Sequence, residues 1–137
     1  MLSAGGVVSG SPVEVAEAFL AAFNAGDLAA LRACLARDAT ALVTGPDGEP
    51  VEIAGADAYV AAVTAMNLPA VDYSVTLTQA PVPVGDDQVL VMVEVRARRG
   101  DRTLHNYAAH LLLVRGGRVA RLAMVEAKPA ESDRFWA

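Results

Sequence analysis

The stretch that decides the fold is TLHNYAAHLLLVRGGRVARLAMVEA, from Thr103 to Ala127. It contains two apolar runs of strand length joined at Gly116 and Gly117, and a Gly-Gly pair between such runs predicts a tight antiparallel hairpin. Side chains alternate along a strand, so seven residues share one face. They are Asn106, Ala108, His110, Leu112, Leu122, Met124 and Glu126. Because this face is apolar apart from an amide, an imidazole and a carboxylate, we expect it to line a closed pocket.

The strand that precedes this hairpin extends the pocket face. Residues 88–99 read as a strand, and a two-residue loop at Gly100 and Asp101 pairs it with the next strand so that Val91 lies opposite His110. The valines at 91, 93 and 95 then share the pocket face, and we expect helices to cover this side. The opposite face is predicted to carry a polar cluster made of Glu94, Arg96, His105 and Tyr107.

The first quarter of the chain is predicted to form two short helices. Ser11 and Glu14 have the spacing of a capping box around Pro12, so a helix starts at Pro12. Gly26 is a natural left-handed stop for this helix. A second helix is predicted over residues 28–36, and it packs on the first because almost nothing separates the two.

Shorter elements connect these helices to the hairpins. We expect brief strands at residues 39–44 and 51–53, a third helix from about Asp57 to Met66, and a strand at residues 71–79. Helices followed by a long antiparallel meander are typical of the α+β class, in which helices cover one face of a sheet.

Length and composition bound the class of protein. With 137 residues the chain suits one domain, and no second core is expected. No uncharged apolar run reaches ~18 residues, so the sequence predicts no membrane-spanning helix. The net charge of -5 argues against a nucleic-acid partner, because affinity for phosphates comes from clustered Lys and Arg.

The two ends of the chain are predicted to lie outside the domain, which we place at residues 11–127. Residues 1–10 lack the charged start and the long apolar run of a signal peptide, so we expect a flexible leader in a cytoplasmic protein. Residues 128–137 are expected to form a C-terminal tail that docks, through Phe135 and Trp136, on the domain or on a partner subunit.

Three segments resemble the nuclear transport factor 2-like superfamily, and within it the branch of SnoaL-like polyketide cyclases and ketosteroid isomerases. They are AFNAGDLAALRACLARDATAL, GPDGEPVEIAGADAY and VRGGRVARLAMVEA. The resemblance implies a cone-like fold, with three N-terminal helices on a strongly curved, mainly antiparallel sheet of about six strands. It implies less about activity, because this cone hosts isomerases, dehydratases, hydrolases, cyclases and proteins without catalysis. The outer sheet face often pairs with another subunit in this superfamily, so we expect a homodimer.

The catalytic pattern of the ketosteroid isomerases is matched only in part. Phe19 stands where that family has its oxyanion tyrosine, and Val43 stands where it has its aspartate base. His110 falls on the second oxyanion acid and Glu126 on a pocket tryptophan, so the resemblance implies a pocket rewired around this pair. A further alternative is epoxide hydrolase-like activity, whose Asp-Arg-Asp arrangement needs Arg96 turned inward, against the predicted register.

His110 and Glu126 are therefore the candidate catalytic residues. An imidazole buried beside a carboxylate can titrate near neutral pH. Within hydrogen-bond reach of each other, the two groups could shuttle a proton, either from the carbon next to a carbonyl or to a leaving hydroxyl. The alternative is a buried histidine satisfied by a neighbouring side chain, with Glu126 at the wet rim of the cone.

The candidate substrate-binding residues come from the predicted inner faces of helices and strands. They are Asn106, Tyr59, Phe19, Phe23, Val91, Val93, Leu112, Leu122 and Met124. Asn106 could orient a substrate carbonyl or serve as a structural amide, and Tyr59 could donate its hydroxyl or be a plain core aromatic. Asp72 and Tyr73, at a strand edge, are expected to meet solvent, and Asp57 is expected to be a helix N-terminal charge.

No metal or cofactor is expected. The two histidines are five residues apart on one strand, so they project to opposite faces and cannot hold one ion. The single cysteine, Cys34, lies in an apolar helical pattern typical of a buried, inert thiol, and no phosphate loop or nucleotide fingerprint is present. The sequence favours a cofactor-independent enzyme that cyclises, isomerises or dehydrates a hydrophobic small molecule. The alternative from another class is a non-catalytic ligand-binding or dimerisation module that uses the same cavity.

Overall fold

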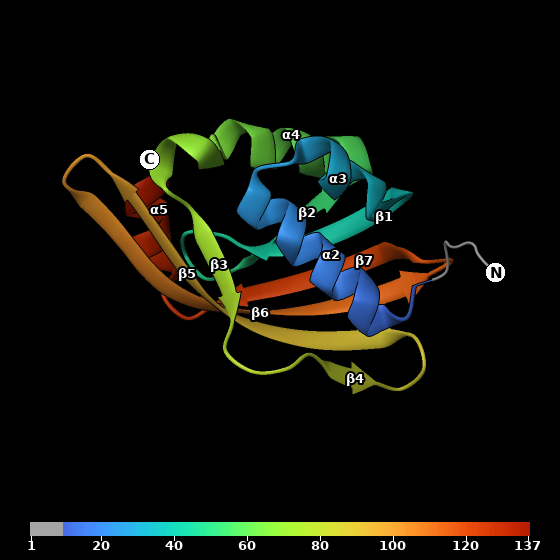
Figure 1. Ribbon diagram of the computed structural model, residues 1–137. Helices are drawn as coiled ribbons and strands as arrows, with labels where there is room; N and C mark the ends of the chain where they lie inside the picture. The colour runs from blue at the N-terminus through green and yellow to red at the C-terminus, as the bar shows by residue number, and fades with distance from the viewer. Residues whose placement is uncertain (1–9) are drawn as a thin grey trace.

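The computed structural model describes residues 10–137, so residues 1–9 of the predicted leader lie outside the described part. The helices are α2 (Pro12–Ala25), α3 (Leu28–Ala33), α4 (Ala56–Met66), the 3-10 helix η1 (Leu68–Val71) and α5 (Pro129–Trp136). The strands are β1 (Leu35–Thr44), β2 (Pro50–Ala54), β3 (Ser74–Leu77), β4 (Val82–Val84), β5 (Gln88–Arg99), β6 (Arg102–Arg115) and β7 (Arg118–Glu126). Figure 1 shows α2, α3 and α4 on one side of a curved sheet, with α5 beside the β5–β6 hairpin. The predicted α+β class is confirmed.

The first two helices follow the local signals in the sequence. At the start of α2, the backbone N–H of Glu14 donates to Ser11 Oγ (3.2 Å) and the N–H of Ser11 donates to Glu14 Oε1 (2.9 Å), which is the predicted capping box. Gly26 ends α2 with a φ of 63°, which glycine adopts without strain. The second helix was predicted too long, because the chain enters β1 at Leu35, which pairs in parallel with Val119 of β7.

One sheet contains all the strands, in the order β2-β1-β7-β6-β5-β3, and β4 pairs with β5 as well. The strands β1 and β7 run parallel, and the other pairs are antiparallel. The predicted register of the β5–β6 hairpin is confirmed, since Val91 lies opposite His110 and Val95 lies opposite Asn106. The two glycines at 116 and 117 both have positive φ, 58° and 76°, so the tight turn depends on them.

Two predictions between β2 and β5 are wrong. The predicted strand at residues 71–79 is replaced by the end of η1 and by the shorter β3. A strand, β4, forms inside the predicted linker, where Pro83 is tolerated because β4 pairs only with β5 and lies at an edge of the sheet.

The core lies between α2, α3 and the inner face of the sheet. Its most completely buried side chains include Phe19, Leu31, Val89, Val91, Leu112 and Leu122. A second, smaller cluster joins the C-terminal helix to the body, because Phe135 packs with Val71, Ala97 and Leu104. No helix within residues 10–137 is both long enough and apolar enough to cross a membrane.

Candidate functional site

A cavity of about 340 Å³ lies on the inner side of the sheet. Its wall combines elements that are far apart in the sequence: Phe23 from α2, Thr44 from β1, Tyr59 from α4, Met124 from β7 and Trp136 from α5. Its volume falls in the range of small-molecule sites, roughly 300–1,000 Å³. The sheet therefore places a ligand-sized, mainly apolar space under α4 and α5.

Both candidate catalytic residues, His110 and Glu126, line this cavity. Three of the nine candidate substrate-binding residues line it with them, namely Tyr59, Phe23 and Met124. Phe19, Val91, Val93, Leu112 and Leu122 do not, because they are buried in the core where the sheet packs against α2. The cavity is displaced from this core toward β1, α4 and α5.

The imidazole of His110 is half-buried at the cavity wall. Its Nδ1 atom is buried without a hydrogen-bond partner in the part of the chain that the structure describes. Burial lowers the pKa of His110 to about 4, because the charged form loses its hydration and gains no counter-charge. The ring is therefore neutral at physiological pH.

Glu126 is hydrogen-bonded through both its carboxylate and its backbone. Its Oε1 accepts a hydrogen bond from Asn106 Nδ2 (3.3 Å), and its backbone N–H donates to Thr44 Oγ1 (3.2 Å). Burial raises the pKa of Glu126, and a hydrogen bond from the Ser132 hydroxyl partly opposes this rise. Within residues 10–137 no hydrogen bond joins Glu126 to His110, and Glu126 lines the cavity while its Oε1 accepts from Asn106.

Two tyrosines, Tyr59 and Tyr73, place phenol groups on the cavity wall. Burial raises the pKa of Tyr59, and it raises the pKa of Tyr73 to about 12 with a smaller contribution from Glu126, so both phenols stay protonated at neutral pH. Tyr73 was expected to meet solvent at a strand edge. Instead η1 precedes it and the side chain turns inward, with its ring centroid 6.4 Å from that of Phe23 and 6.3 Å from that of Trp136. No periodic signal in the sequence marks this turn.

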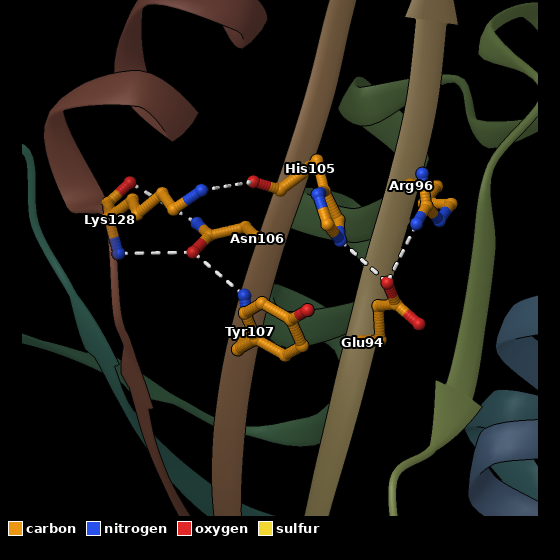
Figure 2. A network of polar contacts seen from close by, with 6 residues as sticks. All are labelled: Glu94, Arg96, His105, Asn106, Tyr107 and Lys128. Carbon is orange, nitrogen blue, oxygen red and sulfur yellow. Dashed lines mark hydrogen bonds and ion pairs between the residues drawn. The ribbon is translucent and has the colours of Figure 1, made fainter.

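Asn106 does not line the cavity. It is 2% exposed, and its side-chain oxygen accepts from the backbone N–H groups of Tyr107 (2.8 Å) and Lys128 (3.0 Å). Figure 2 shows the amide between β6 and the segment that leads into α5. Of the two interpretations that the sequence left open for Asn106, the structure gives it the contacts of the structural amide.

The predicted polar cluster lies on the outer face of the sheet. Glu94 Oε2 lies 2.6 Å from His105 Nε2 and 2.9 Å from an Arg96 guanidinium nitrogen, as Figure 2 shows. The ring of Tyr107 lies beside that of His105, with centroids 5.2 Å apart and planes tilted by 53°. Arg96 therefore points away from the cavity. Asp57, in the first turn of α4, forms an ion pair with Arg32 (2.8 Å) and does not line the cavity either.

The single cysteine, Cys34, ends α3 and is half-buried. Burial raises the pKa of its thiol, so the reactive thiolate is disfavoured.

The helix-covered curved sheet and its apolar cavity define a cone-shaped protein of the nuclear transport factor 2-like superfamily. Residues 16–122 match the family model of the SnoaL-like domain, and the chain belongs to this family. The resemblance of the three sequence segments is thereby confirmed. The chain is also 36% identical over 118 residues to the uncharacterized protein Rv0034 of Mycobacterium tuberculosis, covering 85% of this chain and 89% of the relative.

Two solved structures show how widely the fold is used. IdmH, a candidate polyketide cyclase from Streptomyces antibioticus, superimposes with a TM-score of 0.71 at 20% identity, over 92% of this chain and 99% of IdmH. An LEH-like epoxide hydrolase from Mycobacterium tuberculosis superimposes with a TM-score of 0.71 at 17% identity, over 89% of this chain and 86% of the hydrolase. At these identities the likeness establishes the fold alone, so the activity has to be argued from the cavity.

Proposed function

We propose that the protein is a cofactor-independent acid/base enzyme that cyclises, isomerises or dehydrates a neutral, hydrophobic carbonyl compound. The observation that supports this most is that an imidazole and a carboxylate, His110 and Glu126, line one apolar cavity with pKa values shifted by burial. Such shifted groups in a ligand-sized space are typical of acid/base sites.

Glu126 is the base in this proposal. A carboxylate whose pKa is raised by burial accepts a proton more readily than one on the surface. Glu126 takes a proton from the carbon next to a substrate carbonyl, the electron pair of that C–H bond forms the enolate double bond, and the carbonyl oxygen takes the negative charge. In ring closure, the enolate carbon attacks a second carbonyl of the folded substrate. Glu126 then returns its proton to the new alkoxide.

His110 acts as a neutral hydrogen-bond donor. Burying a nitrogen lone pair without a hydrogen-bond partner costs less free energy than burying an N–H group without one. The single ring proton of neutral His110 is therefore on Nε2, because Nδ1 is buried without a partner. The Nε2–H group, together with the protonated hydroxyl of Tyr59, donates to the developing enolate oxygen. This division of roles replaces the proton shuttle expected from the sequence, since the two groups do not hydrogen-bond each other within residues 10–137.

The charges of the cavity wall favour a neutral substrate. Among the described residues that line the cavity, none is Lys or Arg, and Glu126 is the one carboxylic acid. An anionic ligand therefore finds no counter-charge and is repelled by Glu126. We infer that the substrate reaches the cavity as an uncharged ketone.

Deuterium exchange tests this function without knowledge of the product. In deuterated buffer, the wild-type protein should accelerate loss of the methyl proton signal of 2-acetylnaphthalene, a neutral aromatic ketone, in NMR spectra. Glu126→Gln should reduce this acceleration about 10²-fold or more, because it removes the base, with affinity for the ketone kept within a few-fold. Asp86→Asn is the control, because Asp86 is an exposed carboxylate in the β4–β5 loop and should leave exchange unchanged.

The outcomes separate the alternatives. Binding of the ketone without any accelerated exchange supports the non-catalytic ligand-binding module. Equal exchange in the wild type and in Glu126→Gln contradicts the role given to the carboxylate. The epoxide hydrolase-like alternative is not favoured, because Arg96 pairs with Glu94 on the outer face.

A further inference from the structure

Asn106 has no hydrogen-bonding capacity left for a ligand. Its oxygen accepts two backbone N–H groups, those of Tyr107 and Lys128, and its nitrogen donates to Lys128 O (3.2 Å) and to Glu126 Oε1 (3.3 Å). A primary amide has two lone pairs and two N–H bonds, so these four contacts use all of them. At 2% exposure, the loss of any one of them leaves a buried polar group unpaired.

These four contacts bring three segments to one point. Tyr107 belongs to β6, Glu126 ends β7, and Lys128 precedes the first residue of α5. The backbone N–H of Ala127 also donates to Tyr107 O (2.9 Å), so the whole connection between β7 and α5 is tied to β6. Figure 2 shows the amide between Tyr107 of β6 and Lys128.

The helix that starts at this junction closes one side of the cavity. Ser132 and Trp136 of α5 line the cavity together with Glu126, and the Ser132 hydroxyl lowers the pKa of the Glu126 carboxylate. The far end of α5 rests on the β5–β6 hairpin, where the Arg99 guanidinium lies 5.5 Å from the centre of the Phe135 ring and donates to Ala137 O (3.4 Å). Helix α5 is thus fixed at both ends. Of these two attachments, the one at Asn106 also includes a hydrogen bond to Glu126.

We propose that Asn106 is a positioning residue that fixes the carboxylate of Glu126 and the cavity wall formed by α5 as one unit. The inference rests on the proposed function in so far as Glu126 is its base. An amide is required at this point because it alone donates to a carboxylate and a carbonyl while it accepts from two N–H groups. Aspartate keeps the two acceptor contacts, loses both donor contacts and places a second negative charge beside Glu126.

Asn106→Asp tests the proposal in the ligand-free protein. Carbon-13 NMR of labelled glutamate should show the proton affinity of Glu126 increased about tenfold or more, a pKa rise of about one unit, because the carboxylate loses a donor and gains a like charge. Trp136 is the single tryptophan of the chain, so its fluorescence reports on α5 alone. Quenching of this fluorescence by acrylamide should increase, because α5 loses its anchor.

A second asparagine provides the matched control. Asn24 Nδ2 donates to Val75 O (2.6 Å) and its Oδ1 accepts from Val75 N–H (2.8 Å), so its amide contacts β3 and not Glu126 or α5. Asn24→Asp loses the same kind of donor contact, so it should destabilise the protein without changing the Glu126 titration or the Trp136 quenching. An unchanged Glu126 titration in folded Asn106→Asp, or equal changes in both variants, overturns the proposal.

If Asn106→Asp does not fold, amide hydrogen exchange of the wild type tests the role of Asn106 instead. The Lys128 amide, held by Asn106 Oδ1, should be protected as strongly as the Tyr107 amide on β6. Exchange of Lys128 at the rate of an exposed loop overturns the proposal. These measurements involve no turnover, so they remain decisive even if the deuterium-exchange assay shows no catalysis.

Discussion

His110 and Glu126 lie on one face of the sheet and on adjacent strands, but not directly opposite each other. His110 is paired with Met124, and Glu126 is paired with Ala108. Diagonal neighbours of this kind are roughly 7–8 Å apart between Cα atoms. Both side chains line the cavity, which is the arrangement that the proposed base and oxyanion donor require.

Glu126→Gln is expected to stabilise the protein at neutral pH. Burial raises the pKa of Glu126 in the folded protein, so folding favours the protonated carboxyl group. The resulting contribution to stability is present below the pKa of the unfolded chain. It is lost as the pH rises through the pKa of the folded protein, where the buried group ionises. Glutamine keeps an acceptor for Asn106 and does not ionise. We expect a gain on the order of 1 kcal/mol in the free energy of unfolding at neutral pH, measured by urea titration.

The sign of this effect can be checked by acidification. Below pH 4.5, the ordinary pKa of a glutamate, the wild type and Glu126→Gln both carry a neutral group at this position. The gain in the free energy of unfolding should therefore disappear. Asp86→Asn should show no comparable gain, because Asp86 is exposed. A Glu126→Gln variant that is less stable than the wild type at neutral pH would contradict the assignment of a desolvated carboxylate.

His110 should make the protein sensitive to acid in a defined window. Burial lowers its pKa from 6.5 to about 4. Between these two pH values the imidazole is protonated in the unfolded chain and neutral in the folded protein. Stability should fall as the pH drops from 6.5 toward 4, by at most about 1.4 kcal/mol per pH unit for one group.

His110→Gln removes this dependence. The difference in the free energy of unfolding between the wild type and the variant should shrink as the pH falls, because glutamine binds no proton. His105→Gln serves as the comparison, because His105 is partly exposed beside Glu94 and is not enclosed. Parallel pH curves for the wild type and His110→Gln would show that the imidazole is hydrated in solution.

The sequence predicted the long hairpins well, because their constraints are local. Two glycines fix the β6–β7 turn, and a two-residue loop at Gly100 and Asp101 fixes the register that places Val91 opposite His110. A one-residue slip would have sent His110 to the outer face. The side on which the polar residues of β5 and β6 lie therefore followed from counting along the strands. Glu126 shares the face of His110 because a bulge shifts the β6–β7 pairing from Val114–Val119 to Leu113–Arg121.

Counting along the strands could not predict which residues of this face line the cavity. Leu112 and His110 share a face, but Leu112 packs in the core and His110 lines the cavity, because the helices cover the two positions differently. Tyr73 and Trp136 reach the cavity through η1 and α5, whose placement depends on long-range packing. Alternation along a strand predicts the face of a residue, whereas the position of a void depends on the whole set of covering elements.

The outer face of the sheet is expected to pair two copies of the chain. Val125, Tyr107 and Met92 are 63%, 42% and 39% exposed on neighbouring strands, an apolar area that water solvates poorly. Sedimentation velocity should show a dimer for the wild type and a monomer for Val125→Lys. Val51→Lys is the control, because Val51 is an exposed valine on β2, and it should remain dimeric. A monomeric wild type, or dissociation of both variants alike, would refute the pairing.

Phe135 and Trp136 are adjacent in α5 but should affect different properties. Phe135 is 3% exposed and packs in the cluster with Val71 and Leu104, whereas Trp136 lines the cavity and lies against Tyr73. Phe135→Leu should lower the free energy of unfolding by about 1 kcal/mol or more, because it leaves a gap in a packed cluster. Trp136→Leu should cost less stability and weaken binding of 2-acetylnaphthalene roughly threefold to tenfold, the worth of one aromatic contact. Urea unfolding and ligand-observed NMR measure the two effects, and loss of ligand affinity in Phe135→Leu alone would mean that the cavity wall is not formed by Trp136.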